Sequence, residues 1–332
     1  MTERLSPSDP SGAHRPDVSV IVVSYNTEHL LAPMWDALMN ARRTLDLQVI
    51  VVDNASRDGS VALLRSDPRF AAAELVTNTL NVGFGRANNQ AVSLARGRYL
   101  LLLNTDAFVA PETLEMTVAY MDGHPRHGVL GVQLIGRDGL AQPSCRYFPT
   151  PVNGFLRRTG LGKFFPWVRA VDDLGWDHAA PRECDWVPGC YLLIRRELVD
   201  TIGLFDPRYF MYCEEVDLCR RVKQAGQGVV FFNGTRVVHL GGESAKTDGP
   251  LTAGGQQVSA LQIESDLLYF RKHHGAAGLA VFVLLAWAGD FINACKVLVK
   301  GRGASALTPI GRHARALGET LSKTRMGTIS TR

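Results

Sequence analysis

The sequence predicts a doubly wound α/β fold, in which a mostly parallel sheet carries helices on both faces. Two observations predict it. Short β-branched runs alternate with segments of helical apolar spacing, and the runs are apolar at nearly every position, as in strands covered on both sides. The chain of 332 residues is 46% hydrophobic and 20% charged, which is typical of a globular protein with a sizeable core.

The first unit of this fold is a strand, a helix and a second strand. Its strands are predicted from "VSVIVVSYN" (18–26) and "LQVIVVDNASRDGS" (47–60), which end in turn residues, and its helix from "LLAPMWDALMNARRTL" between them. A right-handed crossover joins the two strands. Further along, the pattern predicts a strand over 73–78, a helix over about 85–96 and a buried strand over 98–109.

The pattern becomes less regular after residue 110. "APETLEMTVAYMDGH" predicts a helix with Pro111 in its first turn. Residues 136–182 are rich in Pro, Gly and Arg, and their sequence supports no assignment. Order returns with a buried strand and a following helix or turn in "CDWVPGCYLLIRRELVDTIGLFD", a helix from about 214 and a strand that ends at His239.

The two ends of the chain differ from the middle. Residues 1–17 are rich in Ser, Pro and Asp and predict a disordered leader without a secretory signal. Residues 246–332 hold eleven Lys and Arg against five Asp and Glu, although the whole chain carries only +4. That net charge is too small to indicate nucleic acid as a partner. The excess of basic residues lies in the C-terminal segment, which we expect to be helical.

This segment contains a run of 14 apolar residues, "AAGLAVFVLLAWAG" (276–289). The run is too short to span a bilayer as a helix, and Asp290 and Asn293 interrupt its continuation. Its basic flanks favour contact with an anionic membrane surface, and the alternative is a helix packed on the main domain. The flanking cations are Arg271, Lys272, Lys296, Lys300 and Arg302.

The six cysteines include no CxxC pair, and the chain is too long to need disulfide bonds for its stability. We expect reduced, mostly buried thiols in a cytosolic setting. A zinc site is not expected, because the pairs six residues apart do not have the spacing of zinc ligands.

Asp53 ends a predicted strand, where a carboxylate can accept hydrogen bonds from a ribose hydroxyl or a base. An equally good interpretation is a turn residue that caps the next helix. "NVGFGRANN" (81–89) is not a dinucleotide fingerprint, since Asn88 stands where the third glycine would be. Gly83 and Gly85 still allow the backbone to approach a phosphate or a sugar closely.

Asn104 and Asp106 follow the most apolar strand of the chain. An acidic turn beside such a strand needs a cation or hydrogen-bond donors, and Mg²⁺ or Mn²⁺ accepts one or two carboxylates together with substrate phosphate oxygens. His239, at another strand end, is a candidate imidazole ligand that favours Mn²⁺. The alternative for His239 is a hydrogen-bonded structural residue.

Three carboxylates stand together in "FDPRYFMYCEEVDLCRR" (205–221). In a helix that starts near 214, Asp217 can pair with Arg221 at i,i+4 and complement the positive helix end. Glu215 points about 100° away from Glu214 and is not explained in this way. With a like-charged neighbour its proton affinity would rise, as a general base working near neutrality requires.

Taken together, these motifs resemble family 2 glycosyltransferases of the GT-A fold, a Rossmann-like fold, and most closely the rhamnosyltransferase-like branch. The resemblance covers about residues 17–245 and is less diagnostic for the tail. It implies a GT-A domain over 18–245, with a nucleotide-sugar half over 18–110 and an acceptor half over 111–245. The motifs that carry it are "VSVIVVSYN", "VVDNASRDGS", "NVGFGRANN", "LLLLNTDA", "CDWVPGCYLLIRR", "FDPRYFMYCEEVDLCRR" and "VVHLGG".

By this resemblance the chain is an inverting hexosyltransferase that uses a nucleotide diphosphate sugar. Asp53 and Tyr25 would hold the nucleoside, and Asn81, Gly83 and Asn89 would line the donor pocket. The sequence does not distinguish a UDP-linked from a dTDP-linked donor.

The same resemblance implies a metal site. Asp106 takes the place of the metal-binding carboxylate of the DXD motif, and Asn104 replaces the first Asp. The site therefore has one charge fewer than usual and would depend on His239 and the diphosphate to hold Mn²⁺ or Mg²⁺.

Glu215 falls where the family places its catalytic base, with a Glu in place of the usual Asp. Glu214 would bind the acceptor or orient the base. Trp186 and Gly189 correspond to the acceptor-side segment, where an indole face can stack on a sugar, and the alternative for Trp186 is a core aromatic.

The basic, apolar tail fits a glycan acceptor carried on a polyprenyl lipid at the inner face of the cell membrane, as in surface polysaccharide assembly. Three other classes compete with this interpretation: a non-catalytic nucleotide-sugar binding protein, a nucleotidyltransferase and a membrane-surface scaffold. A nucleotidyltransferase would normally show a Gly-rich, basic loop after the first strand, which "SYNTEHLL" lacks.

Overall fold

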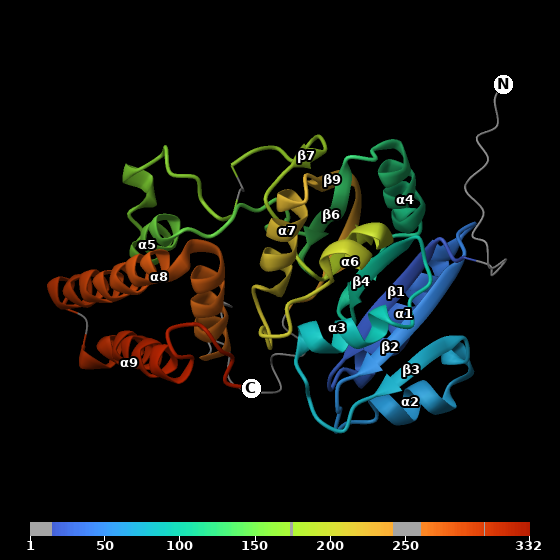
Figure 1. Cartoon of the computed structure of the whole chain (residues 1–332), viewed down its shortest axis with the longest axis horizontal. Helices are drawn as coiled ribbons and strands as arrows, with labels where there is room; N and C mark the ends of the chain where they lie inside the picture. The colour runs from blue at the N-terminus through green and yellow to red at the C-terminus, as the bar shows by residue number, and fades with distance from the viewer. Residues whose placement is uncertain (1–14, 173–174, 242–259, 302) are drawn as a thin grey trace.

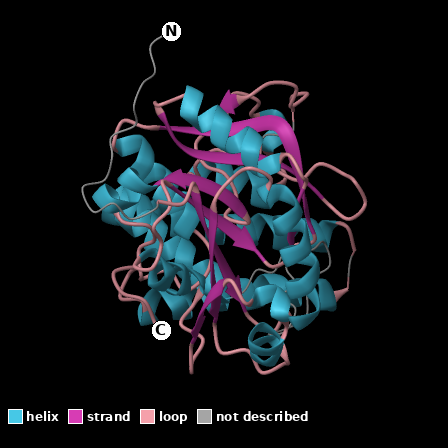
Figure 2. Ribbon diagram, turned by 90° about the vertical axis from the view of Figure 1, so that its right-hand side faces the viewer, coloured by secondary structure: helices cyan, strands magenta, loops and turns pink. Residues whose placement is uncertain are grey.

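The computed structural model describes residues 15–172, 175–241, 260–301 and 303–332. A nine-stranded sheet forms its centre, with helices on both faces (Figures 1 and 2). The predicted disordered leader falls almost entirely on residues 1–14, which lie outside the described residues, as does the start of the basic tail. Asp17 already belongs to the fold, because its carboxylate contacts Arg98 at 3.1 Å.

The N-terminal half is built as the sequence predicts. Its four strands are parallel, and their carboxyl ends meet at one edge of the sheet, where Ser24 lies beside Asp53 and Val23 beside Asn104. Their order is β3 (Ala73–Thr77), β2 (Leu47–Asp53), β1 (Val18–Ser24) and β4 (Tyr99–Asn104). The connecting helices are α1 (Glu28–Arg42), α2 (Ser60–Ser66), a 3₁₀ turn η1 (Pro68–Phe70) and α3 (Phe84–Val92).

Beyond β4 the sheet is mixed, so the expected parallel pairing is found among its first four strands and once more between β6 (His127–Ile135) and β9 (Gly228–His239). β8 (Tyr191–Arg195) runs antiparallel to β4 and to β6. The helix between β6 and β8, α5 (Pro151–Thr159), packs on α8 (Ala260–Val299) and does not cross back over the sheet, so nothing forces β8 to run parallel to β4. Two short strands, β5 (Ala107–Val109) and β7 (Arg182–Glu183), pair antiparallel with β9.

The remaining helices cover the two faces of the sheet and form a layer at one side. α1 and α4 (Thr113–Gly123) bury one face, and α3, α6 (Arg196–Ile202) and α7 (Glu214–Gln224) bury the other. The side layer, on the left in Figure 1, consists of α5 (Pro151–Thr159), α8 (Ala260–Val299) and α9 (Thr308–Lys323). Two short 3₁₀ turns, η2 (Gly162–Phe164) and η4 (Ala304–Leu307), follow α5 and α8 in the chain.

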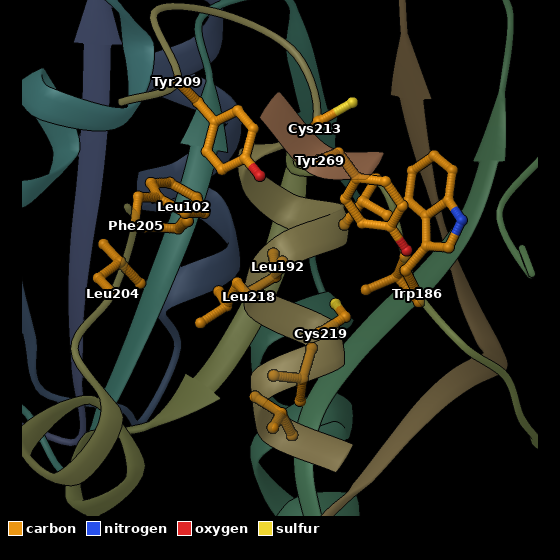
Figure 3. Packing of buried hydrophobic residues seen from close by; sticks show 14 of the residues in the cluster. Leu102, Trp186, Leu192, Leu204, Phe205, Tyr209, Cys213, Leu218, Cys219 and Tyr269 are labelled. Atoms are coloured by element: carbon orange, nitrogen blue, oxygen red, sulfur yellow. The ribbon is translucent and has the colours of Figure 1, made fainter. Parts of the chain in front are cut away.

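The first half of α8 is part of the central core. Tyr269 is fully buried in the same hydrophobic cluster as Leu218 of α7 and Trp186 (Figure 3). Gly275 then breaks the helix with a φ of 68°. The C-terminal segment is therefore helical as predicted, and its beginning packs on the sheet domain.

The second half of α8 has one face on protein and one face exposed. Asp290 accepts hydrogen bonds from Arg158 of α5 and His313 of α9, and Lys296 donates to the Thr159 carbonyl. These polar residues find partners, so they do not end the helix, and the helical stretch is longer than the apolar run of 14 led us to expect. The exposed apolar side chains on the other face are Val281, Leu284, Trp287, Phe291 and Leu298.

Among the described residues α8 is the one helix whose length and composition would allow it to cross a membrane. Core helices of soluble proteins can meet the same criterion, but only 28% of the apolar stretch that meets it here is buried inside the protein. The six cysteines all lie in the described residues and form no disulfide, and five of them are buried.

Candidate active site

Asp53 ends β2 with one carboxylate oxygen used and the other without a partner. Its Oδ1 accepts a hydrogen bond from the backbone N–H of Ser56 at 3.0 Å. Its Oδ2 is buried and has no hydrogen-bond partner among the described residues. Tyr25, half-buried, follows Ser24 at the neighbouring strand end. Asp53 therefore caps the turn and still has one oxygen that can accept from a ligand.

Asn54, which sequence reasoning missed, organises the loop before α3. Its Oδ1 accepts from the backbone N–H of Val82 at 3.0 Å, and its amide donates to Asn81 Oδ1 at 2.8 Å. Asn81 Oδ1 also accepts from the backbone N–H of Gly83 at 2.9 Å. The oxygen of Asn81 is thus used inside the loop, which leaves its amide nitrogen for a ligand. The only signal in the sequence is an Asn directly after a strand-end Asp.

The loop and α3 are held against the segment that leads into α7. Gly83 has a φ of 90°, and a Cβ there would lie 2.5 Å from the carbonyl oxygen of Phe210, so only glycine fits. The N–H of Phe84 donates to that same carbonyl at 2.8 Å. The amide of Asn89 donates to the Phe205 carbonyl and accepts from its N–H, at 2.8 and 3.0 Å. This differs from the expected donor contact, because Asn89 holds two segments together.

Asp106 and His239 meet because β5 pairs with β9. Ala107 lies opposite His239 in the register, and the N–H of Leu240 donates to the Asp106 carbonyl at 3.0 Å. His239 Nε2 lies 3.6 Å from Asp106 Oδ1, and both side chains are largely buried. His239 Nδ1 lies 3.0 Å from Gln142 Oε1, which accepts but cannot donate, so the proton sits on Nδ1. In the neutral imidazole, the lone pair of Nε2 is then on the side of the carboxylate.

This pair suits a divalent cation bound in part by substrate. A carboxylate oxygen and an unprotonated imidazole nitrogen are ligands that Mn²⁺ accepts, and diphosphate oxygens and water can complete its shell. No group of three or more His, Cys, Asp and Glu in the described part of the chain could hold a metal alone. Asn104 ends β4, and its side chain makes no hydrogen bond to Asp106 or His239 among the described residues.

Two glutamates begin α7 after a strained turn. Tyr212 and Cys213 adopt φ values of 74° and 64°, a left-handed conformation that is uncommon for residues other than glycine. The turn places Glu214 and Glu215 in the first helical turn. One oxygen of each, Oε2, is buried and has no hydrogen-bond partner among the described residues.

Burial shifts the acidity of both groups. It raises the pKa of Glu215, and the charge of Arg146 opposes that rise in part. Burial and the charge of Glu215 raise the pKa of Glu214 well above its usual value. Two buried carboxyls side by side resist double ionisation, so the pair retains a proton to higher pH than a solvent-exposed glutamate does.

The turn at Gly189 and Cys190 lies between Glu215 and the strand end that carries Asp106. A Cβ on Gly189 would lie 3.8 Å from the Cβ of Glu215, so the glycine leaves space beside that side chain. Burial raises the pKa of the Cys190 thiol, and the charges of Asp106 and Glu215 raise it further. The hydrogen bonds and packing give the same placement: the N–H of Asn104, two residues before Asp106, donates to the Cys190 carbonyl at 3.1 Å, and the preceding Gly189 lies beside Glu215. The structure thus brings Asp106, His239 and Glu215 to one region from three distant parts of the sequence.

The indole of Trp186 has no exposed face on which a sugar could stack. Its side chain is 5% exposed and packs in the central core with Tyr269 (Figure 3). Its Nε1 donates to the Tyr147 carbonyl at 2.8 Å, and the Arg146 guanidinium lies 4.0 Å from the ring centroid. The indole is a core aromatic with one face covered by Arg146, which corrects the expectation that it stacks on a sugar.

Residues 19–165 match the family described as glycosyl transferase family 2. These residues form a family 2 glycosyltransferase domain. Its sequence is 28% identical over 216 residues to the N-acetylglucosaminyl-diphospho-decaprenol L-rhamnosyltransferase of Mycobacterium tuberculosis, covering 61% of this chain and 69% of that protein. It is 25% identical to the rhamnosyltransferase WbbL of Escherichia coli, covering 67% and 83%.

Solved structures agree on the fold of this glycosyltransferase. The mannosyltransferase PcManGT of Pyrobaculum calidifontis, in complex with GDP-Man and Mn²⁺, gives a TM-score of 0.54 at 19% identity, covering 95% of this chain and 88% of that one. GalNAc-T7 with UDP, GalNAc and Mn²⁺ gives 0.52 at 16% identity, covering 76% and 47%. The fold is therefore the expected GT-A fold, and the enzyme resembles the rhamnosyltransferase-like branch in sequence.

Proposed function

We propose that this glycosyltransferase moves a sugar, with inversion, from a nucleotide diphosphate sugar to an acceptor hydroxyl in cell-surface polysaccharide synthesis. The observation that carries the proposal is the buried carboxylate of Glu215, without a partner among the described residues, in the same region as the Asp106–His239 pair. A candidate base and a candidate diphosphate site in one region are what sugar transfer requires.

The donor binds at the carboxyl ends of β1, β2 and β4. Asp53 Oδ2 accepts from a hydroxyl or N–H of the nucleoside, and Tyr25 packs beside it. The amide nitrogen of Asn81 and the backbone at Gly83 approach the sugar diphosphate. Asp106 and His239 would hold a divalent cation, Mn²⁺ or Mg²⁺, which would supply positive charge to stabilise the diphosphate leaving group.

Glu215 acts as the general base. It removes the proton from the acceptor hydroxyl as that oxygen attacks the anomeric carbon on the face opposite the diphosphate, so the configuration inverts. Burial raises its pKa above the ordinary value, which is the direction that a general base working nearer neutral pH requires. Glu214, whose Oε2 is buried without a partner among the described residues, binds the acceptor, and Gly189 leaves room for the acceptor beside Glu215.

The acceptor is a glycan on a polyprenyl lipid at the cytoplasmic face of the membrane. The Mycobacterium tuberculosis relative is named for such an acceptor, N-acetylglucosaminyl-diphospho-decaprenol. We assign residues 18–110 to the donor, 111–245 to the acceptor and 246–332 to a helical membrane-proximal segment.

The exposed face of α8 lies in the membrane surface instead of crossing the bilayer. A helix whose other face is tied to α5 by Asp290 and Lys296 cannot be surrounded by lipid. Its exposed apolar side chains and the exposed Lys300 that follows match a peripheral helix on an anionic surface.

Replacing Leu284 and Phe291 together by serine is expected to weaken binding to anionic vesicles at least about tenfold, since two large apolar side chains no longer leave water. Co-sedimentation with the vesicles measures this. Leu140→Ser, at a similarly exposed leucine in a loop, is the control and should bind as the wild type does. Equal binding by the double variant would place the membrane contact elsewhere.

A screen of nucleotide sugars by thermal shift, with and without Mn²⁺, tests the function itself. One UDP- or dTDP-linked sugar should raise the melting temperature, because a ligand that binds only the native state stabilises it. His239→Ala should remove the part of the shift that depends on Mn²⁺. A protein that only binds would show the shift without transfer to any acceptor, and a nucleotidyltransferase would instead release pyrophosphate from a nucleoside triphosphate and a sugar phosphate.

A further inference from the structure

A pocket lies on another side of α7 from the candidate base. It has a volume of about 640 Å³ and is lined by the loop 147–150, the start of α5, the C-terminal half of α7 and His274 of α8. None of its lining residues belongs to the site described above. In the helix, Arg220 follows Glu215 by five residues, which places it about 7.5 Å further along the axis and on a different face.

The walls of this pocket carry more positive than negative charge. Lys223 Nζ lies 2.9 Å from Asp185 Oδ1, and the other oxygen of Asp185 accepts from the backbone N–H of Phe148 at 3.0 Å. That pair is therefore neutral and satisfied. Arg169 and Arg220 remain, and no carboxylate among the described residues lies within ion-pair distance of either guanidinium.

Arg220 is held in place by neutral groups. Its Nη1 donates to the Tyr269 hydroxyl and to His274 Nε2, both at 3.0 Å. Burial lowers the pKa of His274, and the charge of Arg220 lowers it further, so the imidazole is neutral and can accept this hydrogen bond. The positive charge of the half-buried Arg220 guanidinium is therefore not compensated by these partners, and it lies beside the pocket.

Aromatic rings position both guanidiniums. Arg169 lies 4.1 Å from the ring centroid of Tyr147, and Arg220 lies 5.5 Å from that of Phe148. A guanidinium that packs on a ring directs the N–H groups at its edge outward, where they match the oxygens of a phosphate. In Arg220, Nη1 is used by Tyr269 and His274 and Nη2 also donates to the His273 carbonyl at 3.5 Å, so Nε and the second N–H of Nη2 are the donors left for a ligand. Two such groups in one pocket match an anion with two adjacent phosphoryl groups.

We propose that this pocket is a binding site for a diphosphate ester, held between Arg169 and Arg220 and separate from the donor site. The ligand comes either from a lipid-linked acceptor or from a soluble diphosphate. The first source rests on the proposed function, and the position of the pocket favours it: α5 and α8 border the pocket, and α8 continues into the exposed apolar face. A lipid diphosphate bound here would place its attached glycan beside α7, the helix that carries Glu215.

Titration with inorganic pyrophosphate in a buffer without divalent cations tests the site without loading the metal site. Arg169→Gln should weaken pyrophosphate binding about tenfold or more, because a charge-assisted pair of hydrogen bonds is lost. Arg65→Gln, which removes an equally exposed charge from α2, is the matched control and should bind as the wild type does. Arg220→Lys keeps the charge without the fork and should also weaken binding, with the folded state checked by circular dichroism.

Vesicles with and without a polyprenyl diphosphate distinguish the two sources. If the lipid diphosphate increases vesicle binding of the wild type and Arg169→Gln removes that increase, the ligand is the lipid. If the variant loses pyrophosphate binding and the lipid diphosphate has no effect, the ligand is a soluble diphosphate. Unchanged pyrophosphate binding in both variants overturns the proposal. Nucleotide-sugar binding with Mn²⁺ should be the same in Arg169→Gln, so failure here is separate from failure of the proposed function.

Discussion

Glu215→Gln is expected to reduce sugar transfer by about 10² to 10⁴ while nucleotide-sugar binding is retained. The amide has nearly the shape of the carboxylate but cannot take the proton of the acceptor hydroxyl. Asp53, Asp106 and His239 are untouched by the change, so the donor should still bind. Steady-state kinetics and the Mn²⁺-dependent thermal shift measure the two effects separately.

The pH profile of the wild type gives an independent check of the same residue. Burial raises the pKa of Glu215 above its ordinary value of 4.5, and the base must be ionised to act. Activity should therefore fall on the acid side at a pH above 4.5 and recover as the pH rises. Glu215→Asp should retain part of the activity. Near-full transfer by the Gln variant would exclude Glu215 as the base.

Asp217→Asn is expected to lower the free energy of unfolding by about 3 kcal/mol or more. The Asp217 side chain is fully buried and lies 2.8 Å from Arg221 Nε, 2.5 Å from Lys272 Nζ and 2.6 Å from His273 Nε2. The variant leaves the positive charge of Arg221 and Lys272 without this carboxylate. Because Lys272 and His273 belong to α8, the same change loosens α8 from the helix that carries Glu215.

Urea unfolding followed by circular dichroism measures this loss. Asp200→Asn, which removes an exposed carboxylate that pairs with Arg196, is the control and should cost less than about 1 kcal/mol. An Asp217 variant as stable as this control would show that α7 and α8 are held together by apolar contacts alone.

The effect of Asp217 depends on pH with a defined sign. Burial opposes its ionisation, but hydrogen bonds from His273 and Lys272 and the charge of Arg221 outweigh burial and hold its pKa below 3.8. A carboxyl with a depressed pKa stabilises the fold above its unfolded value and loses that contribution as the pH falls through the folded one. The wild type and Asp217→Asn should differ fully near neutral pH and converge below about pH 3.8.

The strand-end residues could be predicted because a parallel sheet sends the carboxyl ends of its strands to one edge. Asp53 and Asp106 follow from that rule. The contact between Asp106 and His239 depends on the antiparallel register of β5 and β9, which brings together residues 133 positions apart. No local pattern encodes such a register, so His239 had to remain one of two interpretations until the structure was known.

The supporting contacts could not be predicted, because Asn, Trp and Asp each have several roles that local sequence does not distinguish. Asn54 and Asn89 bind backbone groups of distant segments, and Trp186 packs in the core, which was one of the two roles that its sequence allowed. Asp217 does pair with Arg221 as its spacing predicts, yet its contacts with α8 come from the tertiary fold.

The contacts of the C-terminal segment with the rest of the protein could not be predicted from local sequence either. Asp290 reads as an interruption of an apolar run, whereas in the structure it accepts hydrogen bonds from α5 and α9 and the helix continues to Val299. Composition correctly indicated a helical segment with an apolar surface. It could not show that the first half of α8 is buried against the sheet domain.

The most direct test is the position of Mn²⁺, located by anomalous scattering, in crystals of Glu215→Gln with the nucleotide sugar that gives the largest thermal shift. The account predicts Mn²⁺ bound to Asp106 Oδ1 and His239 Nε2 at about 2.0 to 2.3 Å, with the anomeric carbon facing residue 215. Mn²⁺ bound elsewhere, or a donor sugar turned away from residue 215, would contradict it.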